Sequence, residues 1–406
     1  MDKFKKIWIV ILLITIPFIG GMIVGDRMDR AVSTNLPANQ EKESQRELPR
    51  MDELNKLIEE NYLFDVDEKK VEESVYKGLF EGLGDPYSVY LNEEEYQSLM
   101  ESTSGKYAGV GIVVSVSEDN FITVVSPIEG TPAAEAGIRT GDKIVQVYET
   151  SYTGKQMDDA VDKMRGEPNT DVILTISRPV KDKADEVFDV TLTRRIIQTH
   201  TVKSQILNGN IGYITINQFD ENTYKEFSSE YEKVKSEGAT GIILDLRNNP
   251  GGVLPITVQI ADMLLPEGPI VKTVDKKGNE QIESSEASME DQPMTVLVNQ
   301  GSASASEILA GALKDYGRAV IIGETSFGKG IVQRIFPLSE NVETGPGVKL
   351  TISEYYTPKG TKIHGVGVEP DIKIELDKEI TELGPDHLDQ DEQLQEAITN
   401  ITERIR

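Results

Sequence analysis

Residues 294–333 read MTVLVNQGSASASEILAGALKDYGRAVIIGETSFGKGIVQ, and no other part of the chain is as informative. The apolar run MTVLVNQ predicts a strand, the small residues of GSASASE predict a sharp turn, and ILAGALKDYG predicts a helix. AVIIGET then predicts a further strand. A turn of this kind presents a side chain at the carboxyl end of a strand, where ligands gather in open α/β sheets.

The same alternation extends outward from this stretch over residues 190–375. IGYITINQF, GIILDLRNN and VKLTISEYYT predict strands, several of them buried on both faces, and TYKEFSSEYEKVKSEG and PITVQIADMLL predict helices between them. Strands that alternate with helices are typical of an α/β core with a partly parallel sheet. Residues 376–406 form an acidic tail, and EQLQEAITNITERIR at its end has helical periodicity.

Residues 101–182 have a different pattern, which is rich in β-strands. GVGIVVSVSEDNFITVVSPI predicts two strands, and EGTPAAEAGIRTGDKIVQV predicts a short helix, a tight turn and another strand. This order resembles a PDZ domain, which adds a ligand's C-terminal strand to a sheet edge and holds its carboxylate on backbone N–H groups. The resemblance places that site at Gly109, Val110, Gly111 and Ile112.

The N-terminal part of the chain predicts a membrane anchor, a linker and a helical region. Three lysines precede the uncharged run from Ile7 to Gly25, which at about 1.5 Å per residue just spans a hydrocarbon core. Residues 1–25 therefore predict a transmembrane helix with a cytoplasmic N-terminus, and a cleaved signal peptide is the alternative. Residues 26–47 are polar and predict a linker, and residues 48–100 contain amphipathic helices.

Composition excludes several function classes. The chain has 406 residues, which favours more than one domain, and a formal net charge of −27. So acidic a composition argues against nucleic-acid binding, which requires a basic face. The chain has no cysteine, which excludes disulfides, thiol catalysis and cysteine-ligated metal.

Serine and lysine together predict a hydrolase. A serine hydroxyl is a weak nucleophile until a base removes its proton, and none of the three histidines lies in residues 294–333. An amine is therefore the nearest candidate base, a known variant of the hydrolase theme. Lys329 would have to be uncharged, which requires burial or nearby cations. The local residues do not choose among Ser302, Ser304 and Ser306, and a capping role at the helix start remains open.

Several motifs occur together in one order: GDPYSVYL, the PDZ-like segment, DLRNNPGG, GSASASEI, GETSFGKGIVQ and YYTPKG…GVGVEPD. The chain resembles the carboxyl-terminal processing peptidases, a bacterial serine peptidase family. The resemblance implies an α/β core similar to the crotonase and ClpP folds with an inserted PDZ domain. It also implies the site residues: Ser304 as nucleophile, Lys329 as base, Gln333 as its support, and Ala305 with Gly251 or Gly252 as oxyanion amides.

The sequence therefore predicts a membrane-anchored, extracytoplasmic endopeptidase that recognises exposed C-termini of protein substrates. A homodimer is expected from the resemblance, and no cofactor or metal is expected. Arg165, at the end of a predicted helix, is a candidate contact between the PDZ domain and the protease, with a solvated helix-end arginine as the alternative. The alternative functions are a catalytically inactive PDZ adaptor and a crotonase-like acyl-CoA enzyme.

Overall fold

The computed structural model describes residues 21–22, 50–181, 183–286, 289–340, 345–377, 380 and 382–405. The expected anchor (1–25) and linker (26–47) lie outside these residues, apart from Gly21–Met22. No helix in the described ranges has the length and hydrophobicity to cross a bilayer. Two compact units divide the chain: unit 1 comprises residues up to Ser98, Ser204–Phe219 and Ser228–Arg406, and unit 2 comprises Leu99–Lys203 and Asp220–Phe227.

The α-helices are α2 (Met51–Asn61), α3 (Glu68–Glu81), α4 (Glu93–Ser104), α5 (Pro132–Glu135), α6 (Met157–Met164), α7 (Thr223–Ser236), α8 (Leu254–Leu264), α9 (Ala305–Asp315) and α10 (Glu392–Arg404). The strands are β1 (Gly21–Met22), β2 (Val89–Leu91), β3 (Lys106–Gly109), β4 (Ile112–Val116), β5 (Ile122–Pro127), β6 (Lys143–Val147), β7 (Thr150–Ser151), β8 (Asp171–Arg178), β9 (Glu186–Thr193), β10 (Arg195–Gln198), β11 (Val202–Leu207), β12 (Ile211–Ile216), β13 (Gly241–Asp245), β14 (Gly268–Asp275), β15 (Glu280–Ser285), β16 (Met294–Val298), β17 (Ala319–Gly323), β18 (Ile331–Pro337), β19 (Gly347–Tyr356) and β20 (Ile372–Lys373). Two short 3₁₀ turns cover Gly154–Gln156 and Pro385–His387.

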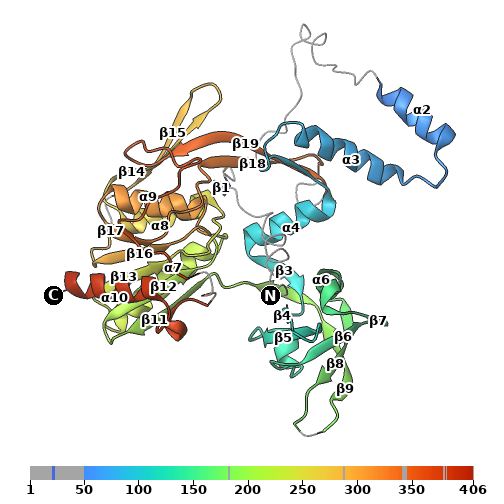
Figure 1. Cartoon of the computed structure of the whole chain (residues 1–406), viewed down its shortest axis with the longest axis horizontal. Helices are drawn as coiled ribbons and strands as arrows, with labels where there is room; N and C mark the ends of the chain where they lie inside the picture. Colours follow the sequence, from blue (N-terminus) through green and yellow to red (C-terminus); the bar gives the residue numbers. More distant parts are fainter. Residues whose placement is uncertain are drawn as a thin grey trace, which may run out of the picture. The chain divides into compact units, whose positions relative to one another are not determined.

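Unit 1 is built on the predicted parallel sheet, whose strand order is β11-β12-β13-β16-β17-β20. The pairs β12–β13, β13–β16, β16–β17 and β17–β20 are all parallel. Every residue of β13 and β16 is buried, which explains why these strands are continuous apolar runs rather than alternating ones. The sequence-based prediction of an α/β core is confirmed (Figure 1).

Helices cover this sheet and complete the core. Leu394, Ala397 and Ile401 of α10 pack in one cluster with Ile243 of β13 and Leu297 of β16. Helices α8 and α9 contact each other, and α9 also contacts β17. The α9 helix is buried along most of its length, so its N-terminus is fixed in the interior.

A second sheet of unit 1 has the order β1-β18-β19-β14-β15, with β2 paired to β19. Its β18–β19, β14–β19 and β2–β19 pairs are antiparallel. The long strand β19 therefore touches three other strands, and β18 leads directly out of the segment that contains Lys329.

Unit 2 contains the β-rich segment. Its main sheet has the order β4-β5-β6-β8-β9, with β7 paired to β6, and β3 pairs with β10 separately. Ile122, Ile144, Leu174 and Ile176 belong to its buried core, which is distinct from that of unit 1. Strand β4 lies at the edge of the sheet, where an added strand can pair.

The N-terminal helices of unit 1 appear where the apolar spacing predicted them. A capping box precedes α4, since Asn92 N–H donates to the Glu95 side chain and Glu95 N–H donates to the Asn92 side chain. By contrast, α2 buries none of its residues and leaves Leu54, Leu57 and Ile58 exposed.

Candidate functional site

Two neighbouring parallel strands end at the same place in unit 1. β13 and β16 are paired, and their carboxyl ends lead into the loops at 246–253 and 299–304. The first loop contains the glycine-rich segment and the second contains the three serines. This is the edge of an open parallel sheet at which ligands bind.

The three serines of the second loop have different environments. The Ser302 hydroxyl donates to Leu246 O at 2.8 Å, and the Ser306 hydroxyl donates to Asn249 O at 2.9 Å. Both therefore tie the start of α9 to the loop that follows β13. Ser304 lies between them as the N-cap residue of α9, so the structure favours Ser304 as the candidate nucleophile.

Ser304 also has an unusual backbone. Its φ of 52° and ψ of −112° lie outside the regions that L-residues ordinarily adopt. Such strain persists only when the surroundings impose it, and it concentrates at functional sites. The next residue, Ala305, is the first of α9, and its N–H belongs to the helix turn whose amides have no acceptor within the helix.

The glycine-rich loop is held by its own asparagine. The Asn249 side chain donates to Ile216 O at 2.7 Å and accepts from Gly251 N–H at 2.8 Å. Phe219 N–H donates to Gly251 O, and Val253 N–H donates to Phe219 O, which forms a parallel bridge opposite Gly252. In such a bridge the N–H of the central residue points away from the partner.

This geometry distinguishes between Gly251 and Gly252, the two glycines whose N–H groups were expected to donate to the oxyanion. The Gly251 N–H is already bonded inside the loop, whereas the Gly252 N–H is directed away from Phe219. Gly252 has a φ of 142°, and a Cβ there would lie 1.9 Å from Phe219 O. Only glycine fits this position, and Gly252 is the better candidate donor.

Lys329 is buried, with 4% of its surface exposed. Its Nζ lies 4.4 Å from the centre of the Tyr87 ring. Burial, reinforced by the charge of Lys349, lowers the pKa of Lys329 from 10.5 to about 7, against the opposing effects of Asp85 and Glu307. A large fraction of this amine is therefore uncharged near neutral pH, as a general base requires.

Glu307 joins the two segments that carry Ser304 and Lys329. One carboxylate oxygen accepts from Ser304 N–H and Lys329 N–H, each at 2.8 Å. The other accepts from Gly328 N–H and the Ser326 hydroxyl, each at 2.6 Å. Burial raises the pKa of Glu307, and these hydrogen bonds oppose the rise.

Tyr355 adds a second link between the same segments. Its hydroxyl donates to Ser304 O at 3.0 Å and to Lys329 O at 2.6 Å. The sequence analysis missed Glu307 and Tyr355. The signal for Glu307 was its position three residues after a helix N-cap serine, the spacing of a capping box.

Gln333 contributes an acceptor to this region. It is 2% exposed, and its Nε2 donates to the Thr351 hydroxyl at 3.4 Å. Its Oε1 is buried and has no hydrogen-bond partner among the described residues. A buried acceptor without a partner is rare and calls for a functional explanation, and an amine donor would satisfy it.

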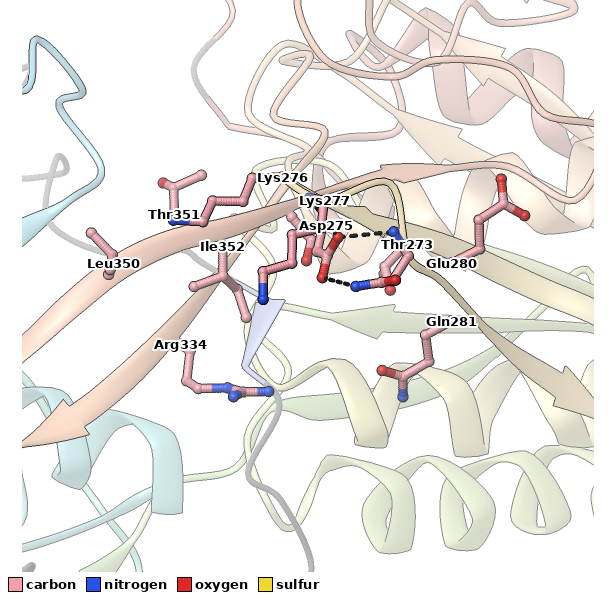
Figure 2. A pocket seen from close by; sticks show the side chains of 12 residues that line it. Thr273, Asp275, Lys276, Lys277, Glu280, Gln281, Arg334, Leu350, Thr351 and Ile352 are labelled. Carbon is pink, nitrogen blue, oxygen red and sulfur yellow. Dashed lines mark hydrogen bonds between the residues drawn. The ribbon is translucent and has the colours of Figure 1, made fainter. Parts of the chain in front are cut away.

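A cavity of about 510 Å³ lies on strands β14, β15, β18 and β19. Thr351 belongs to its lining and also accepts the Gln333 hydrogen bond. Figure 2 shows Arg334 and Lys276 among the residues around it, with Asp275 held by its bonds to Asn279 in the β14–β15 turn.

The predicted carboxylate loop of unit 2 connects β3 to β4. Gly109 ends β3, Val110 is buried, Gly111 has a φ of 77°, and Ile112 begins β4. A Cβ on Gly111 would lie 2.3 Å from Thr131 Cβ, so this position also requires glycine. The loop lies at the start of the edge strand, where a PDZ domain binds its ligand.

Arg165 follows α6 and contacts residues of unit 2. Its guanidinium lies 3.7 Å from the Glu101 carboxylate and 5.3 Å from the centre of the Tyr107 ring. Its predicted role as a link between domains stays a prediction. Among the described residues, no group of acidic or histidine side chains could hold a metal ion.

Three family models match successive parts of this chain, and curated proteins resemble it over most of its length. Residues 210–374 match the model of peptidase family S41, residues 123–178 match that of the PDZ domain, and residues 18–95 match that of the activating protease CtpB N-terminal domain. A carboxy-terminal-processing protease of Bartonella bacilliformis is 39% identical over 85% of this chain and 79% of its own length. A carboxyl-terminal-processing protease of Synechocystis is 40% identical over 72% of this chain and 68% of its own length.

One solved structure supports the fold. A putative S41 protease from Bacteroides fragilis, 16% identical, aligns over 80% of this chain and 90% of its own with a TM-score of 0.53. A photosystem II D1 C-terminal processing protease, 30% identical, aligns over 84% of this chain and 89% of its own with a TM-score of 0.49. From these similarities in sequence, the chain belongs to the carboxyl-terminal processing proteases of peptidase family S41, with a PDZ domain.

Proposed function

We propose that the protein is a membrane-anchored, extracytoplasmic endopeptidase that works with a serine–lysine dyad. The observation that carries the proposal is that Glu307 binds both Ser304 N–H and Lys329 N–H, while Tyr355 binds both carbonyls. These four bonds fix the backbone of the candidate nucleophile to that of the candidate base. Such fixed geometry contributes to catalysis because it removes the entropic cost of bringing the reacting groups together.

The reaction would proceed through an acyl-enzyme. The uncharged Lys329 amine takes the Ser304 proton as Oγ attacks the substrate carbonyl carbon. The oxyanion of the tetrahedral intermediate accepts hydrogen bonds from Ala305 N–H and Gly252 N–H. The Lys329 ammonium then donates its proton to the leaving amine, and a water molecule hydrolyses the Ser304 ester by the same steps in reverse order.

Gln333 would hold the base in place between these proton transfers. Its buried Oε1 lacks a partner and can accept from the Lys329 amine. An inactive adaptor is the alternative function. It gives no reason to bury a lysine and lower its pKa to about 7, because a buried amine destabilises the fold and an adaptor gains nothing from it.

A fluorophosphonate active-site probe distinguishes the enzyme from the adaptor. We expect the full chain to be labelled at Ser304 and to cleave an unstructured protein that has a free C-terminus. Ser304→Ala and Lys329→Ala should each lose at least about 10³-fold in cleavage rate. Ser302→Ala is the matched control, because it removes a neighbouring hydroxyl with a structural role. Undiminished cleavage by folded Ser304→Ala would refute the proposal.

The remaining parts of the proposed function concern the location of the protein and its assembly. Unit 2 would bind the substrate's C-terminal carboxylate at residues 109–112, and residues 1–25 would anchor the body outside the cytoplasm. Deleting residues 2–25 should therefore move the protein from the membrane fraction to the soluble fraction. The exposed apolar side chains of α2 would pair with a second copy in a homodimer, which sedimentation of the body without residues 1–25 can test.

A further inference from the structure

A second lysine lies within the same part of unit 1. Lys349 is on β19, opposite Ile335 of β18 and opposite Val89 of β2. Thr351, two residues further along β19, pairs with Gln333 and accepts its hydrogen bond. Because side chains two apart on a strand point to the same face, Lys349 lies on the face of the sheet that carries Thr351 and Gln333.

Lys349 is half-buried, and its ammonium lacks a close partner among the residues that the structure describes. Among the described residues it forms no hydrogen bond and no ion pair within 4.0 Å. Lysines are seldom buried without a partner, because desolvation disfavours the charged form. Burial lowers the pKa of Lys349, and the nearby charge of Asp85 opposes that effect.

The charge of Asp85 acts on both lysines. Its carboxylate accepts from Tyr87 N–H at 2.9 Å and from the Ser88 hydroxyl at 2.5 Å. The Ser88 oxygen in turn accepts from Thr351 N–H at 3.0 Å, which joins this turn to β19. Although burial opposes it, these hydrogen bonds lower the pKa of Asp85, so the carboxylate is ionised at neutral pH.

The groups that act on the Lys329 amine come from three elements. Tyr87 and Asp85 belong to the turn before β2, Glu307 belongs to α9, and Lys349 belongs to β19. Of these, Lys349 is the only one that disfavours the charged form of Lys329, and its effect ranks next after burial. Asp85 and Glu307 have the opposite effect.

We propose that Lys349 is a positioning residue of the active site, whose positive charge beside Asp85 keeps Lys329 in the uncharged form that accepts the Ser304 proton. A neighbouring cation is one of the known ways in which enzymes activate a lysine. The inference rests on the proposed serine–lysine function and adds a residue to it. Lys349 itself neither touches the substrate nor transfers a proton.

The test compares Lys349→Gln, which removes the charge, with Lys349→Arg, which retains it. For each variant of the full chain, the rate of fluorophosphonate labelling at Ser304 and kcat/KM for a peptide are measured from pH 5 to 10. In the pH–rate profile, the rate rises on an acid limb as Lys329 loses its proton and then reaches an alkaline plateau. In Lys349→Gln this acid limb should move to higher pH, while the rate on the alkaline plateau is retained. Each pH unit of movement lowers the rate on the acid limb about tenfold.

Three further variants sharpen the comparison. Lys349→Arg should restore the position of the limb, and Asp85→Asn should move it to lower pH, because an anion near Lys329 is lost. Lys359→Gln makes the same change in net charge at an exposed lysine and should leave the limb where it is in the wild type. If Lys349→Gln does not fold, as judged by its melting temperature, the opposite shift in Asp85→Asn still tests the electrostatic coupling.

Two results would overturn the inference. One is an acid limb in Lys349→Gln at the wild-type pH, and the other is an equal loss of rate at every pH, which indicates a structural role. Failure of the underlying function looks different, because Ser304→Ala would then be labelled or would cleave like the wild type. The two failures are therefore distinguishable within one set of measurements.

Discussion

Ser304 and Lys329 are the residues on which the proposed chemistry depends, and both are held in unfavourable states. Ser304 has a positive φ, and Lys329 is buried with its pKa lowered to about 7. Neither state is stable alone, so the surrounding contacts must maintain both. The carboxylate of Glu307 and the hydroxyl of Tyr355 do so, because each bonds both residues.

The lowered pKa of Lys329 makes a prediction about stability. An unfolded chain binds a proton at this lysine below 10.5, whereas the folded chain binds it only below about 7. Stability therefore rises with pH between these two values, and below about pH 7 the full penalty of burying the lysine remains. Lys329→Met removes the group and should stabilise the fold by roughly 1.4 kcal/mol for each pH unit below 10.5, up to a few kcal/mol.

Urea unfolding at pH 9 and pH 7 measures this effect. The stability gained by Lys329→Met over the wild type should be larger at pH 7 than at pH 9. Lys359→Met, at an exposed lysine, should show no such dependence. Equal gains at both pH values would contradict the lowered pKa. A gain in stability with a loss of activity is the usual trade-off at active sites.

At the scale of elements, the C-terminal helix is locked to the strand that leads into the glycine-rich loop. Arg247, two residues after β13, binds Asp391 through two bonds of 2.8 Å and also binds Asp245. Asp391 is the N-cap of α10 and accepts from Leu394 N–H. Since Arg247 immediately precedes Asn248 and Asn249, α10 helps to fix the loop that presents Gly252.

Removing one partner of this buried network should be costly. Asp391→Ala leaves Arg247 with one carboxylate fewer and removes the cap of α10, so we expect a loss of about 3–5 kcal/mol in the free energy of unfolding. Asp389→Ala, at an exposed aspartate two residues earlier, should change it by less than about 0.5 kcal/mol. Urea unfolding of both variants checks this, and similar midpoints would show that α10 does not depend on the network.

At the scale of the whole molecule, each unit has a hydrophobic core of its own among the described residues. Unit 1 contains Ser304, Lys329 and Gln333, and unit 2 contains the loop at 109–112 with the edge strand β4. The proposed function assigns a different part of the substrate to each unit. The C-terminus belongs to unit 2 in this proposal, and the cleaved bond belongs to unit 1.

Binding to unit 2 should depend on a free carboxylate. In the full chain with Ser304→Ala, a peptide with a free C-terminus should bind about tenfold or more tightly than its amidated form, because charged hydrogen bonds are lost. Gly111→Val should weaken binding of the free peptide, since its side chain would collide with Thr131. Gly137→Val is the matched control, with the same φ of 77° and open space around it. Fluorescence anisotropy measures all three, and equal affinities of both peptides would contradict the prediction.

Sequence alone determined the architecture and most of the named residues. Apolar runs gave the strands β12, β13, β16, β17 and β19, and helical spacing of apolar residues gave the helices between them. Gly111 and Gly252 were also predicted as site positions from the sequence, since glycine tolerates the close approach of other atoms and a positive φ. The site residues were predicted from the resemblance of several motifs to a known family. Local patterns alone had left the choice among the three serines open.

Only the tertiary structure decided how these residues act on one another. It distinguished Ser304 from Ser302 and Ser306 through bonds to residues more than 50 positions away. It also separated Gly252 from Gly251, and it brought Glu307, Tyr355, Asp85 and Lys349 to Lys329. The reason is physical: burial and the sum of nearby charges set the pKa of an amine, and both depend on which distant segments fold against it.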